Sequence, residues 1–269
     1  MHHSSHSSSY PGTNLPRTLQ RPPLPRVPAE SIGAIAPELA GVPVEYVKRH
    51  LASNARQMLA GSASLSIPSP TKGHLPAYLS VGCRPSRGAT YPTHLLAIGC
   101  SKVNAHADQT MMFVPTHAIV LAAHCSRTPP LDATVSHPSE DKLRLRIVRM
   151  MIPSPAAFSI LHNYMYNLRP DGVVHALLPR LPANMISSLR TQEAIRATLG
   201  SGTTKHQLAS ALAHGASYNL SHLTSCAAHA KEMWHDMVSL GMNDALLWDT
   251  LDLCWEIILA ALNLAFSRQ

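Results

Sequence analysis

The chain changes its hydrophobic period within a short stretch, and this change limits the folds that it can adopt. Residues 142–151 (KLRLRIVRMM) alternate basic and apolar side chains, the period of two that is typical of a half-exposed β-strand. Phe158, Leu161 and Met165 then recur at i, i+3 and i+7, which predicts a helix that Ser154 caps. A strand followed directly by a helix indicates a mixed α and β fold.

Further strands and helices are predicted upstream of this point. In chain order they are a helix over 43–60 ended by Gly61, a strand over 77–81, a strand over 93–100, a turn over 103–109, a strand over 110–114 and an apolar helix over 117–124 capped by Thr116. The two strands on either side of the turn are expected to form a hairpin, and 142–151 provides a further strand of the same small sheet.

The rest of the chain has helical periodicity. The predicted helices cover 173–178, 183–199, 204–214, 218–240 and 244–266. Thr204 with Gln207 fits a capping box, Gly241 a C-terminal stop, and Asn243 the next N-cap. The predicted class is therefore α+β and predominantly helical, a small sheet with covering helices followed by an α-helical C-terminal bundle.

Composition divides the chain into four parts. Hydrophobic residues make up 45% of it, which is enough for a core, while charged residues make up only 14%. We expect a disordered Ser/His/Pro tail over 1–30, a helix with a Pro/Ser/Gly-rich linker over 31–92, a core over 93–170 and a helical C-terminal region over 171–269. Pro22, Pro23 and Pro25 fit a linker better than a polyproline ligand.

Location and redox state follow from what the chain lacks. Its first residues contain no apolar segment of a signal peptide, and no stretch is apolar for long enough to span a membrane. The five cysteines are scattered without a CxxC pair, which favours reduced, buried thiols. We therefore expect an intracellular protein, nuclear or cytoplasmic, with no membrane partner.

The net charge is positive in the first two hundred residues and negative in the rest of the chain. Residues 1–200 hold 19 Lys and Arg against 9 Asp and Glu, and residues 201–269 hold 3 against 6. The basic side chains that could contact nucleic acid are those of Lys142, Arg144, Arg146 and Arg149 in the strand and of Arg17, Arg21 and Arg26 in the tail. A charged outer face on an edge strand also prevents aggregation, so nucleic acid is a possible partner that we do not favour.

Two short segments resemble the BTB/POZ core. Residues 114–125 (VPTHAIVLAAHC) are similar to the family motif that joins a strand to a helix, and residues 153–166 (PSPAAFSILHNYMY) to its Pro-Phe-Leu-Tyr helix. The matching positions are His117, Val120, Leu121, Ala122 and Ala123, followed by Pro155, Phe158, Leu161 and Tyr164 or Tyr166. Ala118 and Cys125 depart from the basic residue and the serine of the motif. The resemblance implies that His117 is structural.

A second resemblance covers most of the chain. Residues 86–94 (SRGATYPTH), 114–125, 153–162 and 247–265 (LWDTLDLCWEIILAALNLA) are similar, in this order, to the clampless protein family of mushroom-forming fungi. The resemblance implies a role in sexual development, in clamp-cell formation and maintenance of the dikaryon.

Chemical sites are weakly indicated. His222, Cys226 and His229, spaced i, i+4 and i+7, are candidate zinc ligands with Cys254 on the next helix, but packing explains them better. Asp249, Asp252 and Glu256 fit the solvated face of an amphipathic helix rather than an acid/base pair. We therefore expect no enzyme activity, no metal or other cofactor and no small-molecule substrate.

The function that we predict is protein–protein interaction. A BTB-like core binds other proteins, or a second copy of itself as a homodimer, through an apolar helix and a strand edge. The residues predicted for this surface are Arg144 and Arg146 on the basic edge and Asn163 and Tyr166 on the helix that follows.

Overall fold

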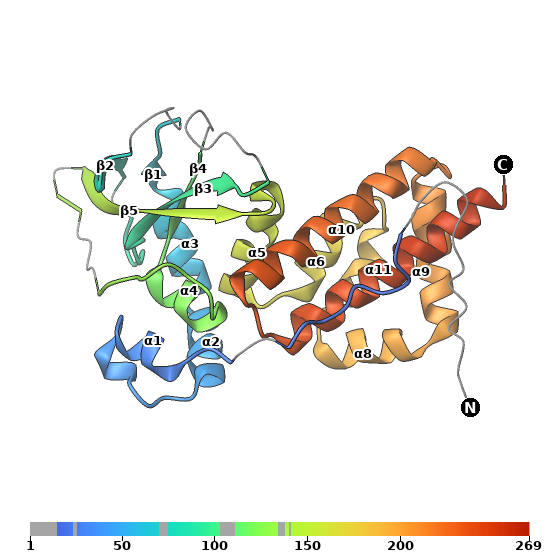
Figure 1. The fold of residues 1–269 in the computed structure, drawn as a ribbon, viewed down its shortest axis with the longest axis horizontal. Coiled ribbons are helices and arrows are strands. Elements are labelled where there is room, and N and C mark those ends of the chain that lie inside the picture. The colour runs from blue at the N-terminus through green and yellow to red at the C-terminus, as the bar shows by residue number, and fades with distance from the viewer. Residues whose placement is uncertain are drawn as a thin grey trace.

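The structure is a computed structural model, and it describes residues 15–23, 26–69, 75–84, 86–102, 111–133, 138–139 and 141–268. Figure 1 shows a sheet with its helices on one side of the molecule and a purely helical region on the other. The predicted class, α+β and mostly helical, is confirmed. The predicted turn at 103–109 and the first residue of the strand at 110–114 lie outside the described residues.

Five strands form one sheet. They are β1 (Leu65–Ser66), β2 (Tyr78–Cys83), β3 (His94–Cys100), β4 (Met112–Thr116) and β5 (Lys142–Ile152), in the order β1-β2-β5-β3-β4. The β3–β4 pair is the predicted hairpin, and β5 runs parallel to β3 and antiparallel to β2. The prediction that the basic strand lies at a sheet edge is wrong, because β5 occupies the centre.

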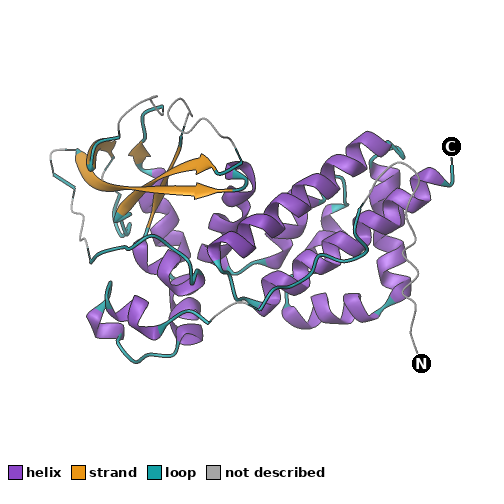
Figure 2. Cartoon of the chain, viewed as in Figure 1, coloured by secondary structure: helices purple, strands orange, loops and turns teal. Residues whose placement is uncertain are grey.

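Helices pack against one face of the sheet, and further helices form the other half of the molecule alone, as Figure 2 shows. Before, between and directly after the strands they are α1 (Ala29–Gly33), the 3-10 helix η1 (Pro37–Leu39), α2 (Val44–Ser53), α3 (Ala55–Ala63), α4 (Ala118–His124) and α5 (Pro155–Asn167). The later ones are α6 (Pro170–Leu177), α7 (Ala183–Ser187), α8 (Gln192–Gly200), α9 (Gly202–Gly215), α10 (Leu220–Leu240) and α11 (Ala245–Phe266).

Several predicted boundaries differ from the observed ones. The single helix predicted over 43–60 breaks at Asn54, whose backbone leaves the helical region, and Gly61 lies inside α3 rather than after it. The helix predicted over 183–199 is likewise two helices, the second capped by Thr191. Thr116 is still part of β4, so the N-cap of α4 is His117, whose side chain makes no capping hydrogen bond.

The core is continuous from the helix-covered face of the sheet into the helical region. Leu96 and Ile98 of β3 and Val148 and Met150 of β5 belong to the same buried cluster as the apolar faces of α5, α10 and α11. A smaller cluster on the other side of the sheet includes Leu143. Alternate residues of β5 therefore serve two cores, as the period of two requires.

The turn between α10 and α11 fixes the helical region to the sheet domain. Gly241 has a φ of +64°, the left-handed conformation that ends α10 at the predicted stop. Its carbonyl accepts hydrogen bonds from the backbone and the side chain of Ser126, which follows α4. Asp244, one residue after the predicted Asn243, caps α11. None of the helices in the described part of the chain is long and apolar enough to cross a bilayer.

Candidate interaction surfaces

The basic face of β5 lies outward in the structure and includes an aromatic side chain that the sequence did not single out. Arg144 is exposed, and its guanidinium lies 4.4 Å from the centre of the Tyr78 ring on β2. Tyr78 is one of two large hydrophobic side chains that are strongly exposed among the described residues, at 43%, and its backbone is directly opposite that of Arg146. Tyr and Arg are the side chains most often central to protein interfaces.

Arg146 is held in place by a carboxylate. Asp132, in the loop after α4, forms an ion pair with Arg146 and lies 3.0 Å from the Nε2 atom of buried His94. Burial lowers the pKa of His94, and Asp132 opposes that shift. This contact fixes the direction of the Arg146 side chain on the exposed face.

Tyr166 does not lie on a surface, so the prediction that it contacts a partner is wrong. Its side chain is fully buried, and its hydroxyl accepts a hydrogen bond from the His117 backbone amide at 3.1 Å. The Nε2 atom of His117 lies 3.1 Å from the Thr90 carbonyl, which can only accept, so Nε2 carries the proton and donates there. Nδ1 of the neutral ring is therefore an acceptor, and the Tyr166 hydroxyl donates to it at 2.8 Å. Burial lowers the pKa of His117 to about 4, so the ring is neutral and structural.

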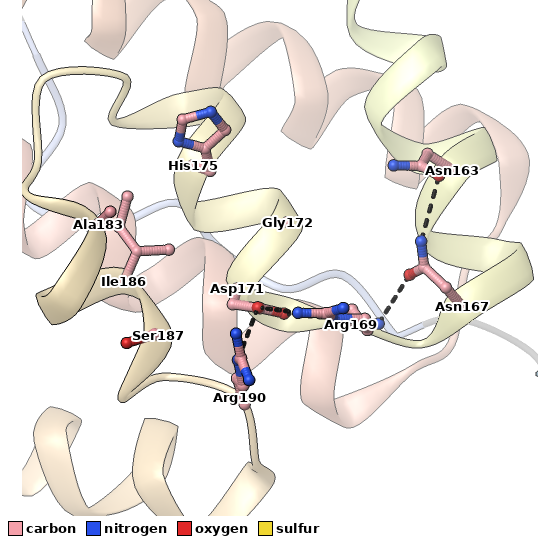
Figure 3. A pocket seen from close by; sticks show the side chains of 10 residues that line it. All are labelled: Asn163, Asn167, Arg169, Asp171, Gly172, His175, Ala183, Ile186, Ser187 and Arg190. Atoms are coloured by element: carbon pink, nitrogen blue, oxygen red, sulfur yellow. Dashed lines mark hydrogen bonds and ion pairs between the residues drawn. The ribbon is translucent and has the colours of Figure 1, made fainter.

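Asn163 is exposed and lines a cavity of about 370 Å³ between α5, α6 and α7 (Figure 3). At its centre Asp171 accepts two hydrogen bonds from Arg169 and one from Arg190. The hydrogen bonds from Arg169 hold the pKa of Asp171 below its usual range. Asp171 is therefore an ionised, fully paired carboxylate, which suits it to hold α6 and α7 together rather than to accept a proton.

The candidate zinc ligands are only partly brought together. The Sγ atom of Cys226 lies 3.9 Å from His222 Nε2 on α10, and both side chains line a shallow pocket together with His229. Burial raises the pKa of Cys226, and it also raises that of Cys254, which favours protonated thiols. Among the residues that the structure describes, no three His, Cys, Asp or Glu side chains are placed to hold one metal ion.

A cavity of about 760 Å³ lies where α2, α5 and α11 meet. Its buried Lys48 is 3.0 Å from a Glu45 carboxylate oxygen and 3.9 Å from one of Asp244. Tyr164 donates a 3.0 Å hydrogen bond to the other Asp244 oxygen, and burial raises the pKa of this tyrosine. These paired charges join the first helices of the chain to the helical region.

The N-terminal segment behaves differently from its predicted disorder over 1–30. Residues 15–22, which we name the strap, run across α10 and α11 without helix or strand structure and bend at Arg17 and Thr18 (Figure 1). Leu19 is only 6% exposed within the core cluster, and the indoles of Trp234 and Trp255 donate hydrogen bonds to the Gln20 and Pro16 carbonyls at 2.8 and 3.2 Å. Residues 1–14 and 24–25 lie outside the described part of the chain.

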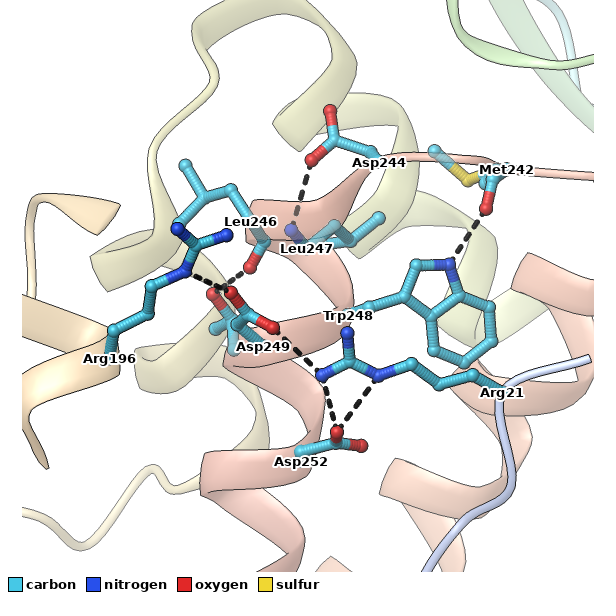
Figure 4. Close-up of polar contacts among 10 residues, drawn as sticks. Arg21, Arg196, Met242, Asp244, Leu246, Leu247, Trp248, Asp249 and Asp252 are labelled. Carbon is cyan, nitrogen blue, oxygen red and sulfur yellow. Dashed lines mark hydrogen bonds and ion pairs between the residues drawn. The ribbon is translucent and has the colours of Figure 1, made fainter. Parts of the chain in front are cut away.

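The acidic stripe of α11, which consists of Asp249, Asp252 and Glu256, is paired with basic side chains. Arg21 donates from Nη2 to Asp249 at 2.8 Å and from Nε to Asp252 at 2.9 Å, while Arg196 of α8 donates to the other oxygen of Asp249 (Figure 4). Lys205 of α9 pairs with Glu256 in the same way. The prediction of a solvated face is therefore wrong for Asp249, whose side chain is only 11% exposed, whereas Asp252 and Glu256 remain partly solvated although basic residues distant in sequence pair with them.

Asp236 is a buried carboxylate at the contact between the two halves of the molecule. It lies on α10, and one oxygen accepts a 2.8 Å hydrogen bond from the Ser154 amide at the start of α5. The other oxygen has no partner among the described residues. Burial raises the pKa of Asp236 to about 7, against the opposing effect of the Ser154 hydrogen bond. Its spacing of three from the buried Met233 could have identified it as an inward residue.

Two family models match the chain. The one described as the Clampless protein 1 N-terminal domain matches residues 22–153, which include the whole sheet, and the one described as the Clampless protein 1 C-terminal domain matches residues 171–269. No curated protein and no solved structure gave a significant match. The matched ranges lie on either side of α5, the helix on which Asp236 and Asp244 of the C-terminal region converge.

Proposed function

Because the chain belongs to the clampless protein family, we propose that it is a non-enzymatic regulator of clamp-cell formation and dikaryon maintenance that acts by binding other proteins. Family membership supports the developmental role. The binding mechanism rests instead on the surface of the sheet, and the occupant of that surface is another protein or a second copy of this chain.

The observation that carries the proposal is the pairing of Tyr78 with Arg144 at an exposed end of strands β2 and β5. An exposed aromatic ring with a guanidinium stacked on it is a compact, preorganised contact, because neither side chain must lose much freedom when a partner covers it. Arg146 extends the same surface, held by Asp132. We name these three residues, Tyr78, Arg144 and Arg146, the sheet surface.

The arrangement of elements supports a BTB-like domain. The β3–β4 hairpin leads through α4 to β5, which returns parallel to β3, and α5 follows. This is the hairpin–helix–strand–helix order of the resemblance. In this arrangement β4 ends the sheet, and a terminal strand is where β-augmentation by a partner takes place.

The reactive side chains favour an interaction protein over an enzyme. Burial raises the pKa of Cys125 to about 12 and lowers that of His124 to about 3, so neither group is suited to nucleophilic or acid–base work near neutral pH. His117 is occupied by its structural hydrogen bonds.

The test is a binding experiment on the full chain. Immobilised wild-type protein is compared with a Tyr78→Ala/Arg144→Ala variant, and a Tyr46→Ala/Arg49→Ala variant removes the same residue types from exposed positions on α2. We expect a mating-hyphae extract, or the chain itself, to bind wild type and the α2 variant alike and the sheet variant at least tenfold less. Equal binding by all three would exclude the sheet surface.

Salt dependence separates the proposal from nucleic-acid binding. Phosphate contacts weaken steeply between 50 and 200 mM salt, by about a thousandfold for six contacts. The basic residues here are partly occupied, Arg146 by Asp132 and Arg21 by Asp249 and Asp252. We expect partner binding to weaken far less than this over the same salt range, and nuclease treatment to leave the bound proteins unchanged. A steep loss of binding with salt together with loss after nuclease treatment would support the nucleic-acid alternative instead.

A further inference from the structure

The strap is held by the contacts that proteins use to recognise linear peptide segments. The indole N–H groups of Trp234 and Trp255 donate hydrogen bonds to backbone carbonyls of the strap. The side chain of Leu19 is buried, and Arg21 forms ion pairs with two carboxylates. Within the described part of the chain, no backbone–backbone hydrogen bond joins residues 15–23 to the helices. The strap is therefore attached by side chains of the receiving helices, as a bound peptide would be.

The receiving surface is acidic and lies on two helices. Trp234 of α10 and Trp255, Asp249 and Asp252 of α11 lie on two long adjacent helices; we name these four residues the α10–α11 face. Burial raises the pKa of Asp252, and Asp249 and Glu256 raise it further, even though Arg21 opposes these effects. Without Arg21 the like charges would repel more strongly, so the face requires a cation at this position.

The two side chains of the strap that bind the α10–α11 face lie close together in the sequence. Leu19 and Arg21 are two residues apart, so in an extended segment their side chains fall on the same side, one toward the apolar cluster and one toward the carboxylates. Arg17, four residues before Arg21, is exposed and is not part of these contacts. The recognised pattern is thus Leu-x-Arg in extended form, with carbonyls available to the two indoles.

From this geometry we infer that the α10–α11 face is a peptide-docking site, occupied in cis by the strap and able to bind in trans an extended segment of a partner protein that carries Leu-x-Arg. A basic, proline-flanked segment has the charge and the conformation that this face accepts. The strap acts as an internal competitor, since a partner must displace Leu19 and Arg21 to bind.

The experiment uses the full chain and a fluorescent peptide of residues 15–22 (LPRTLQRP), followed by anisotropy. An Arg21→Ala strap variant is expected to bind the peptide saturably, and wild type at least tenfold more weakly, because only wild type retains the complete competitor. Adding Asp249→Asn and Asp252→Asn to the strap variant should abolish binding. A peptide with Arg17→Ala should bind as well as the parent, and one with Arg21→Ala should not bind.

Three results would overturn the inference. In the first, the peptide does not bind saturably to a strap variant whose circular dichroism matches that of wild type. In the second, a scrambled peptide of the same composition binds as well as the parent peptide. In the third, the protein forms a concentration-dependent dimer in which the two copies exchange straps. The last would make the face a contact between copies of this chain. If Arg21→Ala does not fold, Leu19→Ala, which keeps the ion pairs, replaces it with the same expected order of affinities.

The inference goes beyond the proposed function and can fail separately from it. The peptide experiment involves neither the sheet surface nor a developmental phenotype. Loss of partner binding in the Tyr78→Ala/Arg144→Ala variant would leave the α10–α11 face untouched, and failure of the peptide to bind would leave the sheet surface untouched.

Discussion

Replacing Asp236 by Asn should stabilise the protein at alkaline pH and have little effect in acid. The carboxyl is fully buried, one of its oxygens accepts from the Ser154 amide, and the other has no partner among the described residues. The charged groups nearest to it are Lys102, after β3, and Glu232 on its own helix. An asparagine keeps the acceptor for Ser154 and removes the buried negative charge.

The size of the effect follows from the pKa of Asp236, about 7 in the folded protein against an ordinary value of 3.8. The folded state binds this proton more tightly than the unfolded chain, so the free energy of unfolding falls as the pH rises from 3.8 to 7. At 1.36 kcal/mol for each pH unit, the upper limit is roughly 4 kcal/mol. Relaxation around a buried charge reduces such costs, so we expect about 2 kcal/mol.

Urea unfolding at pH 4 and pH 8 measures this directly. The Asp236→Asn variant should be more stable than wild type by about 2 kcal/mol at pH 8 and nearly equal to it at pH 4. Glu38→Gln, which neutralises an exposed carboxylate, is the control and should shift neither value by more than about 0.5 kcal/mol. Destabilisation of Asp236→Asn at pH 8 would refute the reasoning, because the carboxylate would then be a favourable partner in the contact.

Three further substitutions test the packing. Gly241→Ala should destabilise the protein by about 1–3 kcal/mol, since the φ of Gly241 is +64° and a Cβ would lie 2.2 Å from Ser126 Oγ. Gly200→Ala, which has open space around it, is the control and should leave the stability unchanged; thermal melting compares the two variants. Tyr166→Phe should cost about 1–3 kcal/mol in urea unfolding, because the His117 amide and ring both lose their buried partner. Leu19→Ala should accelerate trypsin cleavage after Arg17, whereas a rate equal to wild type would show that the strap is not held by its buried leucine.

Local sequence patterns predicted much of the secondary structure, but they did not predict where each element lies in the fold. The period of two identified β5, and the caps at Ser154 and Gly241 are where the sequence indicated. The central place of β5 depends on its pairing with β2, which is far away in the chain and leaves no trace in the period of β5 itself. The break at Asn54 also lacks a proline or glycine signal.

For the candidate sites too, local sequence patterns predicted some properties and not others. Arg144 and Asn163 are exposed as predicted, because polar residues on a periodic segment face solvent. Tyr166 is buried because its hydroxyl satisfies His117, a partner on another element that residue type alone does not reveal. The strap contains too few apolar residues to predict order; its position depends on two tryptophans and two carboxylates more than two hundred residues away.

Complementation of clamp formation tests the proposed function most directly. A mushroom strain that lacks its clampless gene would receive wild type, the Tyr78→Ala/Arg144→Ala variant or the Tyr46→Ala/Arg49→Ala variant, each at matched protein levels. Wild type and the α2 variant should restore clamp cells at the hyphal septa, and the sheet variant should not. Full restoration by the sheet variant would contradict the proposal that this protein acts by docking partners on its sheet surface.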